Sequence, residues 1–240
     1  MAKLDWNLIF DRFQDVKVLV IGDAMIDSYM WGQIERQSPE APIPIVNVKR
    51  FENRLGGAAN VAVNLQSLGA TPIICTVIGE NDKGFLSLLE NQGLSQEGVL
   101  QEDRLTTVKT RIISEGKHQL RVDEEDTYDI ASEDKFIDLC CSLLKKADVV
   151  ILQDYNKGVL TKKTITNIIT SANNKNIPVL VDPKKDNYWD YKNVDLFKPN
   201  FKELSENSNS EIKAGINDGL KTEVQRQRQE LNAKSVMVTL

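Results

Sequence analysis

Two adjacent glycines at the expected start of a helix carry the strongest chemical signal in the sequence. Gly56 and Gly57 open the segment 56–60, which ends in Asn60 and leads into an apolar helical pattern that continues to Leu68. Glycines there let the backbone approach a ligand closely and turn its N–H groups towards it, and the Asn60 side chain can hydrogen-bond a hydroxyl group. The segment matches neither a Walker A motif nor a GxGxxG fingerprint. From spacing alone, a ligand-binding loop and a turn that only packs a helix on a strand are equally good interpretations.

Carboxylates follow two of the expected strands. Asp23 comes just after the apolar run 16–21, with Asp27 four residues later, and Asp154 follows the run 148–152. Ligands of open α/β sheets bind at the carboxyl ends of the strands, where a carboxylate can accept hydrogen bonds from sugar hydroxyls. Asp23 and Asp154 are therefore candidate sugar ligands, although an aspartate in such a place also serves as a turn or cap residue.

Lysines follow the next two strand candidates. Asp182 and Lys184 come after the run 178–181, and Lys198 comes after the run 194–197. Lysines can neutralise a phosphate, and carboxylates can hold hydroxyls or Mg2+. Polar groups at several successive strand ends favour one shared site over unrelated caps.

The segment Asn200–Glu203 has N-x-x-E spacing at an expected helix start. In a capping box, the Asn200 side chain accepts from the backbone of Glu203, and the Glu203 carboxylate accepts from the backbone of Asn200. The functional interpretation instead places both side chains near a hydrated Mg2+ and a phosphate. The spacing is compatible with both.

Arg36 begins a loop whose shape is fixed by Pro39 and Pro42, since proline restricts the backbone. Its guanidinium can clamp an anionic group. A single surface arginine is more often simply solvated, so Arg36 alone does not indicate an anion-binding site.

Short β-branched runs alternate with helical patterns along the chain, which is typical of βαβ units and a doubly wound α/β sheet. Continuous apolar runs indicate strands that are buried on both faces of a parallel sheet. The expected strands are 16–21, 72–78, 148–152, 178–181, 194–197 and 235–240, and the expected helices are 57–68, 83–92, 132–146, 162–174 and roughly 210–232.

Two extended segments, 43–48 and 107–123, break this rhythm, and the second contains a hairpin-turn sequence at 115–117. Glycine in such a turn is typical of a β-hairpin. These ribbons do not belong in a helix-covered core. We therefore expect one domain over 1–240 with a small β lid formed by segments at about 33–50 and 107–123.

Charge and hydropathy exclude several classes of protein. The 240 residues contain 30 Lys and Arg against 35 Asp and Glu, a net charge of −5, which argues against a general nucleic-acid binder. No apolar run approaches the ~18 residues that a transmembrane helix needs, and the acidic N-terminus does not resemble a signal peptide. We expect a cytoplasmic protein without nucleic-acid or membrane partners.

Cysteine and histidine usage narrows the chemistry further. The cysteines are Cys75, Cys140 and Cys141, and the only histidine is His118. Three cysteines fit reduced core thiols better than a disulfide framework. With one histidine, a Cys/His metal cluster and a Ser–His–Asp triad are poorly supported, and a nucleotidyltransferase with a His-x-x-His motif is excluded.

Together these segments resemble the ribokinase-like (PfkB-type) carbohydrate kinase family. The segment 56–60 is similar to the N-terminal signature of the family, and Asn200–Glu203 is similar to its N-x-x-E motif. Within the family, the segments that look like the heptose 7-phosphate kinase domain of bacterial ADP-heptose synthases are 22–23, 36–42 with its Ser-Pro-Glu-Ala-Pro, 56–62, 121–123, 154–158 and 182–184. The resemblance covers nearly the whole chain and implies a ribokinase-like, doubly wound, mostly parallel α/β sheet with a small β lid.

The resemblance also implies an activity. This is the ATP-dependent phosphorylation of the anomeric hydroxyl of D-glycero-β-D-manno-heptose 7-phosphate to the 1,7-bisphosphate, in ADP-heptose and lipopolysaccharide core biosynthesis. ATP and Mg2+ are the implied cofactors, and a homodimer through the β lid is the implied assembly. Such phosphoryl transfer depends on positioning and charge neutralisation more than on covalent chemistry.

Matching positions imply a role for each candidate residue. The residues implied to hold the sugar are Asp23, Gly56, Gly57, Asn60 and Asp154. The phosphate of the sugar is implied to lie on Arg36, with Arg121 and Lys157 as further candidates. Asn200 and Glu203 would serve Mg2+–ATP, with Lys184 and Lys198 near its phosphates.

One departure from the family concerns the catalytic base, an aspartate in a Gly-Ala-Gly-Asp motif. The motif does not occur in the 240 residues, and the resemblance places it beyond Leu240. We therefore expect the C-terminal part of the fold to be absent and this chain, as a fragment or truncated product, to be inactive alone. Two alternatives stay open: a kinase for another sugar or a nucleoside, and a non-catalytic sugar- or nucleotide-binding protein.

Overall fold

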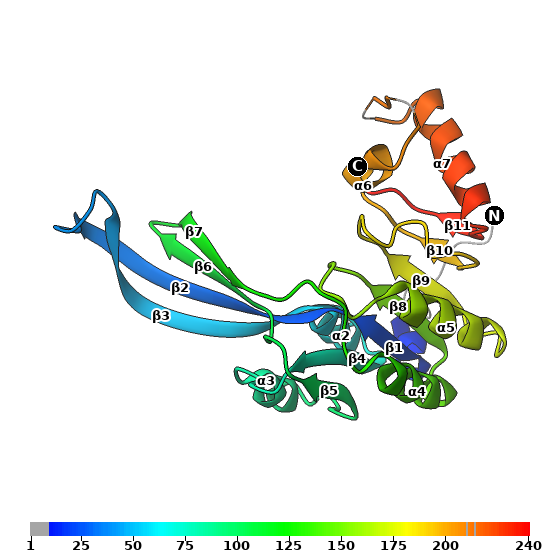
Figure 1. Ribbon diagram of the computed structural model, residues 1–240, viewed down its shortest axis with the longest axis horizontal. Coiled ribbons are helices and arrows are strands. Elements are labelled where there is room, and N and C mark those ends of the chain that lie inside the picture. Colours follow the sequence, from blue (N-terminus) through cyan, green and yellow to red (C-terminus); the bar gives the residue numbers. More distant parts are fainter. Residues whose placement is uncertain (1–9, 210, 214) are drawn as a thin grey trace.

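The computed structural model describes residues 10–209, 211–213 and 215–240 and contains two β-sheets (Figure 1). The main sheet has the strand order β11-β10-β9-β8-β1-β4-β5, and every neighbouring pair is parallel. Its strands are β1 (Lys17–Gly22), β4 (Thr71–Gly79), β5 (Gly98–Glu102), β8 (Val149–Gln153), β9 (Val179–Asp182), β10 (Leu196–Phe197) and β11 (Ser235–Val236). The expected doubly wound, parallel sheet is confirmed.

Helices cover both faces of the main sheet because side chains alternate along each strand. In β1, Val18 and Val20 pack on the side of α2 (Ala58–Ser67) and α3 (Phe85–Asn91), whereas Leu19 and Ile21 pack on the side of α4 (Glu133–Leu143) and α5 (Lys162–Asn173). All four side chains are at most 3% exposed, and this burial stabilises the fold. The helices are η1 (Phe13–Asp15), α2 (Ala58–Ser67), α3 (Phe85–Asn91), α4 (Glu133–Leu143), η2 (Leu144–Lys146), α5 (Lys162–Asn173), α6 (Phe201–Glu206) and α7 (Asp218–Glu230). None of the described helices is long and apolar enough to cross a membrane.

The second sheet projects from the main sheet as a long arm (Figure 1). We call this four-stranded sheet the arm; its strands, in the order β3-β2-β6-β7, are β2 (Ala24–Gln37), β3 (Pro44–Gly57), β6 (Val108–Ser114) and β7 (Lys117–Glu124). Both segments expected to be extended, 43–48 and 107–123, lie largely in these strands. Glu115 and Gly116 form the β6–β7 turn with φ of 52° and 73°, the left-handed conformation that a two-residue hairpin turn requires.

Several elements differ from the sequence-based expectation. β2 runs through residues expected to form turns and a loop, and β5 was not expected, because neither segment has the continuous apolar run used to recognise strands. The last helix, α7, begins after its cap Asn217 rather than near Ser210, which itself lies outside the described residues. β11 is shorter than the expected 235–240, although Thr239 still forms a bridge with Asn200.

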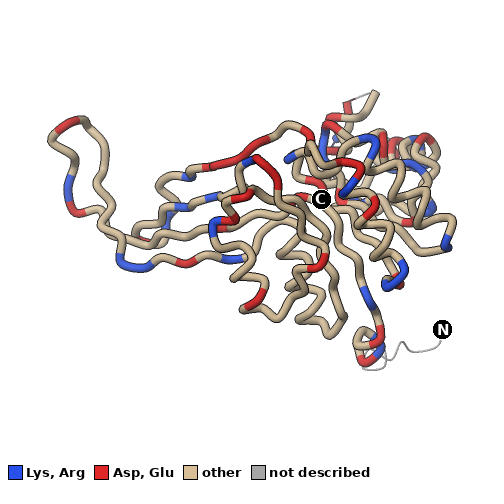
Figure 2. The backbone as a smooth tube through the Cα atoms, turned by 60° about the horizontal axis from the view of Figure 1, so that its bottom comes forward, with Lys and Arg blue, Asp and Glu red and all other residues tan. Residues whose placement is uncertain are grey.

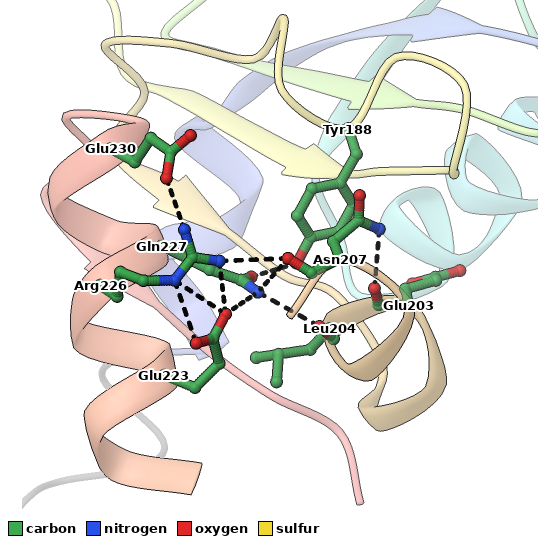
Figure 3. Close-up of polar contacts among 8 residues, drawn as sticks. All are labelled: Tyr188, Glu203, Leu204, Asn207, Glu223, Arg226, Gln227 and Glu230. Carbon is green, nitrogen blue, oxygen red and sulfur yellow. Dashed lines mark hydrogen bonds and ion pairs between the residues drawn. The ribbon is translucent and has the colours of Figure 1, made fainter. Parts of the chain in front are cut away.

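A buried polar network fixes α6 against α7 (Figure 3). The fully buried Gln227 accepts from the Tyr188 hydroxyl at 2.5 Å and donates to the backbone oxygen of Leu204 at 3.2 Å. Asn207 donates from Nδ2 to the backbone oxygen of Glu203 at 2.9 Å. Buried polar groups that are fully paired rigidify the structure around them, so this network holds Glu203 in place relative to the main sheet.

Candidate functional site

The carboxyl edge of the main sheet brings together many of the candidate residues. We use this term for the loops that follow β1, β8, β9 and β10, in which Asp23, Asp154, Lys184 and Lys198 lie. Parallel strands end on one side of a sheet, so these loops are neighbours. The root of the arm starts at the same edge, because β2 begins only two residues after β1 ends.

Asp23 is 1% exposed, and backbone N–H groups surround its carboxylate. Tyr155 and Lys157 donate to Oδ2 at 2.7 and 3.2 Å, and Val159 donates to Oδ1 at 3.1 Å. Burial, and after it the charge of Asp154, raise the pKa of Asp23 to about 6, although the three N–H groups act in the opposite direction. The carboxylate therefore shapes the loop that follows β8.

Asp154 is equally buried at 1% exposure. Its Oδ1 accepts from the Asn156 backbone at 2.7 Å, and its Oδ2 accepts from Asn187 Nδ2 at 3.1 Å and from the Tyr191 hydroxyl at 2.7 Å. The resemblance implies that Asp23 and Asp154 hold the sugar, whereas their positions in the sequence also fit turn or cap residues. In the structure both carboxylates are buried and accept hydrogen bonds from the protein, which matches the second interpretation: they position loops.

Asp27 lies at the root of the arm with 22% of its side chain exposed. Its Oδ1 accepts from Arg111 Nη1 at 2.5 Å, and a Cβ added to Gly56 would lie 2.6 Å from its Oδ2. A Cβ on Gly57, whose φ is +57°, would lie 2.3 Å from the backbone oxygen of Asp23. A side chain at Gly56 would collide with Asp27, and one at Gly57 would collide with the backbone of Asp23, so close packing requires glycine at both positions. Because Gly56 has no side chain, the Asp27 carboxylate stays open on that side.

Sequence reasoning gave Asp27 and Arg111 no role. Asp27 lies inside β2, which was not expected, and Arg111 lies inside the second ribbon rather than after a strand. The signal that could have revealed Arg111 is its alternation with Lys109, since residues two apart in a strand share one face.

Asn60 is exposed in the first turn of α2. It lines a surface cavity of about 270 Å³ beside β3, together with Glu52 and Arg54. Arg54 is the register partner of Asp27 across β2 and β3, so this cavity borders the Asp27 face of the arm.

Basic and acidic residues alternate along the backbone of the arm (Figure 2). Lys109 Nζ lies 2.5 Å from Glu125 Oε2 and 3.0 Å from Asp123 Oδ2, and Lys157 Nζ lies 2.7 Å from Glu125 Oε1. Arg121, which is 60% exposed, pairs with Asp123 at 2.9 Å. Lys157 and Arg121 therefore belong to one chain of ion pairs that joins the arm to the loop after β8.

Lys184, Asn200 and Glu203 meet elsewhere on the carboxyl edge. Lys184 forms an ion pair with Glu203, whose Oε2 accepts from the Asn200 backbone at 2.9 Å, while Asn200 Oδ1 accepts from the Glu203 backbone at 2.8 Å. The N-x-x-E spacing therefore forms a capping box, one of its two interpretations. Lys198 pairs with Asp182 at 3.0 Å.

Tyr155 links this group to the root of the arm. Lys184 Nζ lies 5.8 Å from the centroid of the Tyr155 ring. The pKa of Tyr155 is raised first by burial and then by the charge of Asp182, with further contributions from Asp27 and Asp23. Tyr155 therefore lies within the electrostatic influence of both the Lys184 group and the carboxylates at the root of the arm.

Arg36 lies at the outer end of the arm, one residue before β2 ends at Gln37 (Figure 1). It is exposed. Nine residues of strand separate it from Asp27, which corresponds to about 30 Å at ~3.3 Å per residue. Within this chain, the position of Arg36 does not favour its expected role on the phosphate of a sugar bound at the carboxyl edge.

The described part of the chain contains no group of three or more His, Cys, Asp and Glu side chains arranged to hold a metal ion. Its cysteines are free, with Cys75 and Cys140 buried and Cys141 half-buried. The candidate site is therefore built from carboxylates, cations and glycines at the carboxyl edge and the root of the arm.

The sequence matches known proteins over most of its length. A model of the family "pfkB family carbohydrate kinase" matches residues 15–240. The Bifunctional protein HldE of Citrifermentans bemidjiense is 38% identical over 221 residues, which cover 90% of this chain and 44% of that protein. The Bifunctional protein HldE of Helicobacter pylori is 44% identical over 195 residues, or 79% of this chain and 42% of that protein. The chain spans about half the length of the curated relatives it matches.

Solved structures share its fold. Phosphofructokinase-2 from Escherichia coli in complex with fructose-6-phosphate aligns with a TM-score of 0.72 and 20% identity, covering 94% of this chain and 73% of that one. Ribokinase from Arabidopsis thaliana, complexed with ribose and ATP, aligns with a TM-score of 0.66 and 16% identity, covering 93% and 71%. At these identities the likeness establishes the ribokinase-like fold.

Proposed function

This chain belongs to the pfkB family of carbohydrate kinases, and we propose that it binds a sugar phosphate and ATP for phosphoryl transfer to a sugar hydroxyl. The proposed substrate is D-glycero-β-D-manno-heptose 7-phosphate, with transfer to its anomeric hydroxyl to give the 1,7-bisphosphate. The resemblance of the segments 36–42 and 154–158 to heptose 7-phosphate kinases supports this choice, as does the identity with the HldE proteins.

The observation that carries the proposal is the open carboxylate of Asp27 beside Gly56. A partly exposed carboxylate next to a glycine can accept hydrogen bonds from sugar hydroxyls without steric obstruction. Asp23 and Asp154 contribute to this site indirectly. They hold the loop after β8, which lies between the main sheet and the arm. The sugar would then be enclosed by the arm, which acts as the lid.

We assign the nucleotide to the group around Lys184. The ammonium groups of Lys184 and Lys198 lie beside carboxylates and can exchange them for phosphate oxygens. Mg2+ keeps several of its waters and needs only one or two carboxylates. Glu203 fits such an ion through a water molecule, because both its oxygens are engaged by Lys184 and Asn200. When bound, Mg2+ neutralises charge on the transferring phosphoryl group.

The proposal for this chain concerns binding rather than turnover. The resemblance assigns the proton of the attacking hydroxyl to an aspartate in a Gly-Ala-Gly-Asp motif, which the 240 residues do not contain. Binding of sugar phosphate at Asp27 and of nucleotide at Lys184 can be measured without that group.

Ligand-dependent thermal unfolding of the 240-residue chain tests the proposal. A ligand that binds the folded state raises the melting temperature, by about 5 to 10 °C for a chain of this size at roughly 100 times the dissociation constant. We expect this rise with heptose 7-phosphate and a smaller one with fructose 6-phosphate or ribose. An equal rise with fructose 6-phosphate would favour a kinase for another sugar, and no rise with any sugar would contradict the proposal.

We further propose that two copies of the chain pair through the apolar face of the arm. Phe51, Leu120 and Val122 are 55%, 57% and 47% exposed. The register places Phe51 opposite Met30, Met30 opposite Ile112, and Ile112 opposite Leu120, so these side chains share one face. An exposed apolar surface of this kind marks a contact with another protein surface.

Sedimentation velocity checks the proposed pairing. We expect the native chain to sediment as a dimer and Leu120→Glu as a monomer, because a buried unpaired charge opposes association. Gln119→Glu introduces the same charge at the adjacent exposed residue and should leave the dimer intact. A monomeric native chain would refute the pairing without affecting sugar binding at Asp27.

A further inference from the structure

We propose that the Arg111 guanidinium binds the phosphate group of the sugar-phosphate substrate and thereby selects phosphorylated over unphosphorylated sugars. The inference rests on the proposed function, since it assigns a second contact to the same substrate. In this chain Arg111 takes the role that the resemblance implied for Arg36.

Arg111 is held in a fixed orientation at the root of the arm. Its Nη1 donates to Asp27 Oδ1 at 2.5 Å and to the backbone oxygen of Lys109 at 3.3 Å. Its guanidinium carbon lies 5.3 Å from the centroid of the Tyr29 ring. These contacts restrict the side chain before any ligand arrives, so little conformational entropy is lost on binding.

The same contacts leave part of the guanidinium available. In the described residues, the hydrogen bonds of Arg111 are all made by Nη1, so Nε and Nη2 keep their donors, and 23% of the side chain is exposed. The planar arginine fork donates two parallel hydrogen bonds to a phosphate. Because Nη1 stays on Asp27, a phosphate on the other donors lies next to a sugar that the same carboxylate holds.

Neighbouring cations are less suited to this role because carboxylates already neutralise them. Lys109 pairs with both Asp123 and Glu125, and Lys157 pairs with Glu125. Arg54 lies on the same face of the arm, 5.2 Å from the centroid of the Tyr29 ring, but it pairs with Glu52. Arg111 differs from these cations because its carboxylate partner Asp27 engages only Nη1, which leaves its other donors for a phosphate.

The test compares two ligands in calorimetric titrations of the 240-residue chain: heptose 7-phosphate and the same heptose without its phosphate. We expect Arg111→Gln to weaken binding of the phosphorylated sugar by about 100-fold, while binding of the unphosphorylated sugar changes by less than about threefold. Arg111→Lys keeps the positive charge but not the planar guanidinium. It should therefore bind the phosphorylated sugar more tightly than Arg111→Gln does, but less tightly than the native chain. Thermal melts of both variants establish that they fold.

Lys117→Gln is the matched control, because it removes one positive charge from an exposed position of β7 in the same sheet and should not affect the preference for the phosphorylated sugar. Equal weakening of both ligands by Arg111→Gln would show that Arg111 only orients Asp27 and would overturn the inference. Loss of the preference in Arg121→Gln but not in Arg111→Gln would place the phosphate on Arg121 and would overturn the inference too. A native chain that binds neither ligand would instead overturn the proposed function.

Discussion

Replacement of Asp27 by alanine is expected to weaken the binding of sugar phosphates by at least about 100-fold, since the hydroxyls lose a charged acceptor and buried donors are left unpaired. Arg111 also loses the partner that orients it. The free energy of unfolding should fall by about 1 to 3 kcal/mol, because the half-buried Arg111 guanidinium loses a charge-assisted hydrogen bond. Calorimetric titration with heptose 7-phosphate, alongside urea unfolding, measures both quantities.

Two variants show whether the loss belongs to Asp27 itself. Glu35→Ala removes a carboxylate from the outer part of the same strand and should bind sugar as the native chain does. Asp27→Asn keeps the shape but not the charge of the side chain, so its affinity for heptose 7-phosphate should lie between those of the native chain and Asp27→Ala. Native affinity in Asp27→Ala, combined with lost binding in Asp23→Asn, would return the sugar to Asp23.

Asp23 is expected to make the folded chain less stable as the pH rises from about 4 to 6. Burial, followed by the charge of Asp154, raises its pKa to about 6 from an ordinary value of 3.8. In this window the folded state holds a proton that the unfolded state has released, so the free energy of unfolding falls with increasing pH. A shift of about two pKa units corresponds to roughly 3 kcal/mol at most.

Urea unfolding between about pH 4 and pH 7 isolates this effect when the native chain is compared with Asp23→Asn, which cannot ionise. Asparagine turns an N–H group towards backbone donors, so the variant should be less stable than the native chain at low pH. The difference between the two should shrink as the pH rises. Asp129→Asn, at an exposed position, is the control, and its free energy of unfolding should change with pH as that of the native chain does. A difference between the native chain and Asp23→Asn that does not change with pH would contradict the raised pKa of Asp23.

The parallel sheet could be predicted because strands buried on both faces have continuous apolar runs. The runs 16–21 and 148–152 lie within one residue of β1 and β8 at each end. The arm was only partly predicted. Its strand β2 carries Asp27 and Ser28 among apolar residues, and its burial changes from complete to partial along its length, so no single alternation identifies it.

The site was harder to predict because its assignments depend on burial, which neither residue type nor spacing reveals. Asp23 and Asp27 are both carboxylates just after a strand in the sequence, yet only the structure shows that the first is enclosed by N–H groups and the second is open. For Asn200 and Glu203, the spacing fits a cap and a ligand equally well, and the hydrogen bonds between them identify the cap. Gly56 and Gly57 stood out in the sequence because adjacent glycines at a helix start allow close approach to the backbone, and the structure shows close approach by the Asp27 side chain and the Asp23 backbone.

The continuity of β2 has a mechanical consequence. This strand is 14 residues long and spans about 45 Å, with Asp27 near one end and the apolar pairing surface further out. In the proposed dimer this strand would act as a lever, because the apolar face around Met30 lies about 20 Å from the start of the strand. A tilt of about 5° at the root would move Met30 by about 2 Å and the far end of the strand by about 4 Å. Binding of a sugar beside Asp27 would therefore displace the proposed contact between two copies by about 2 Å.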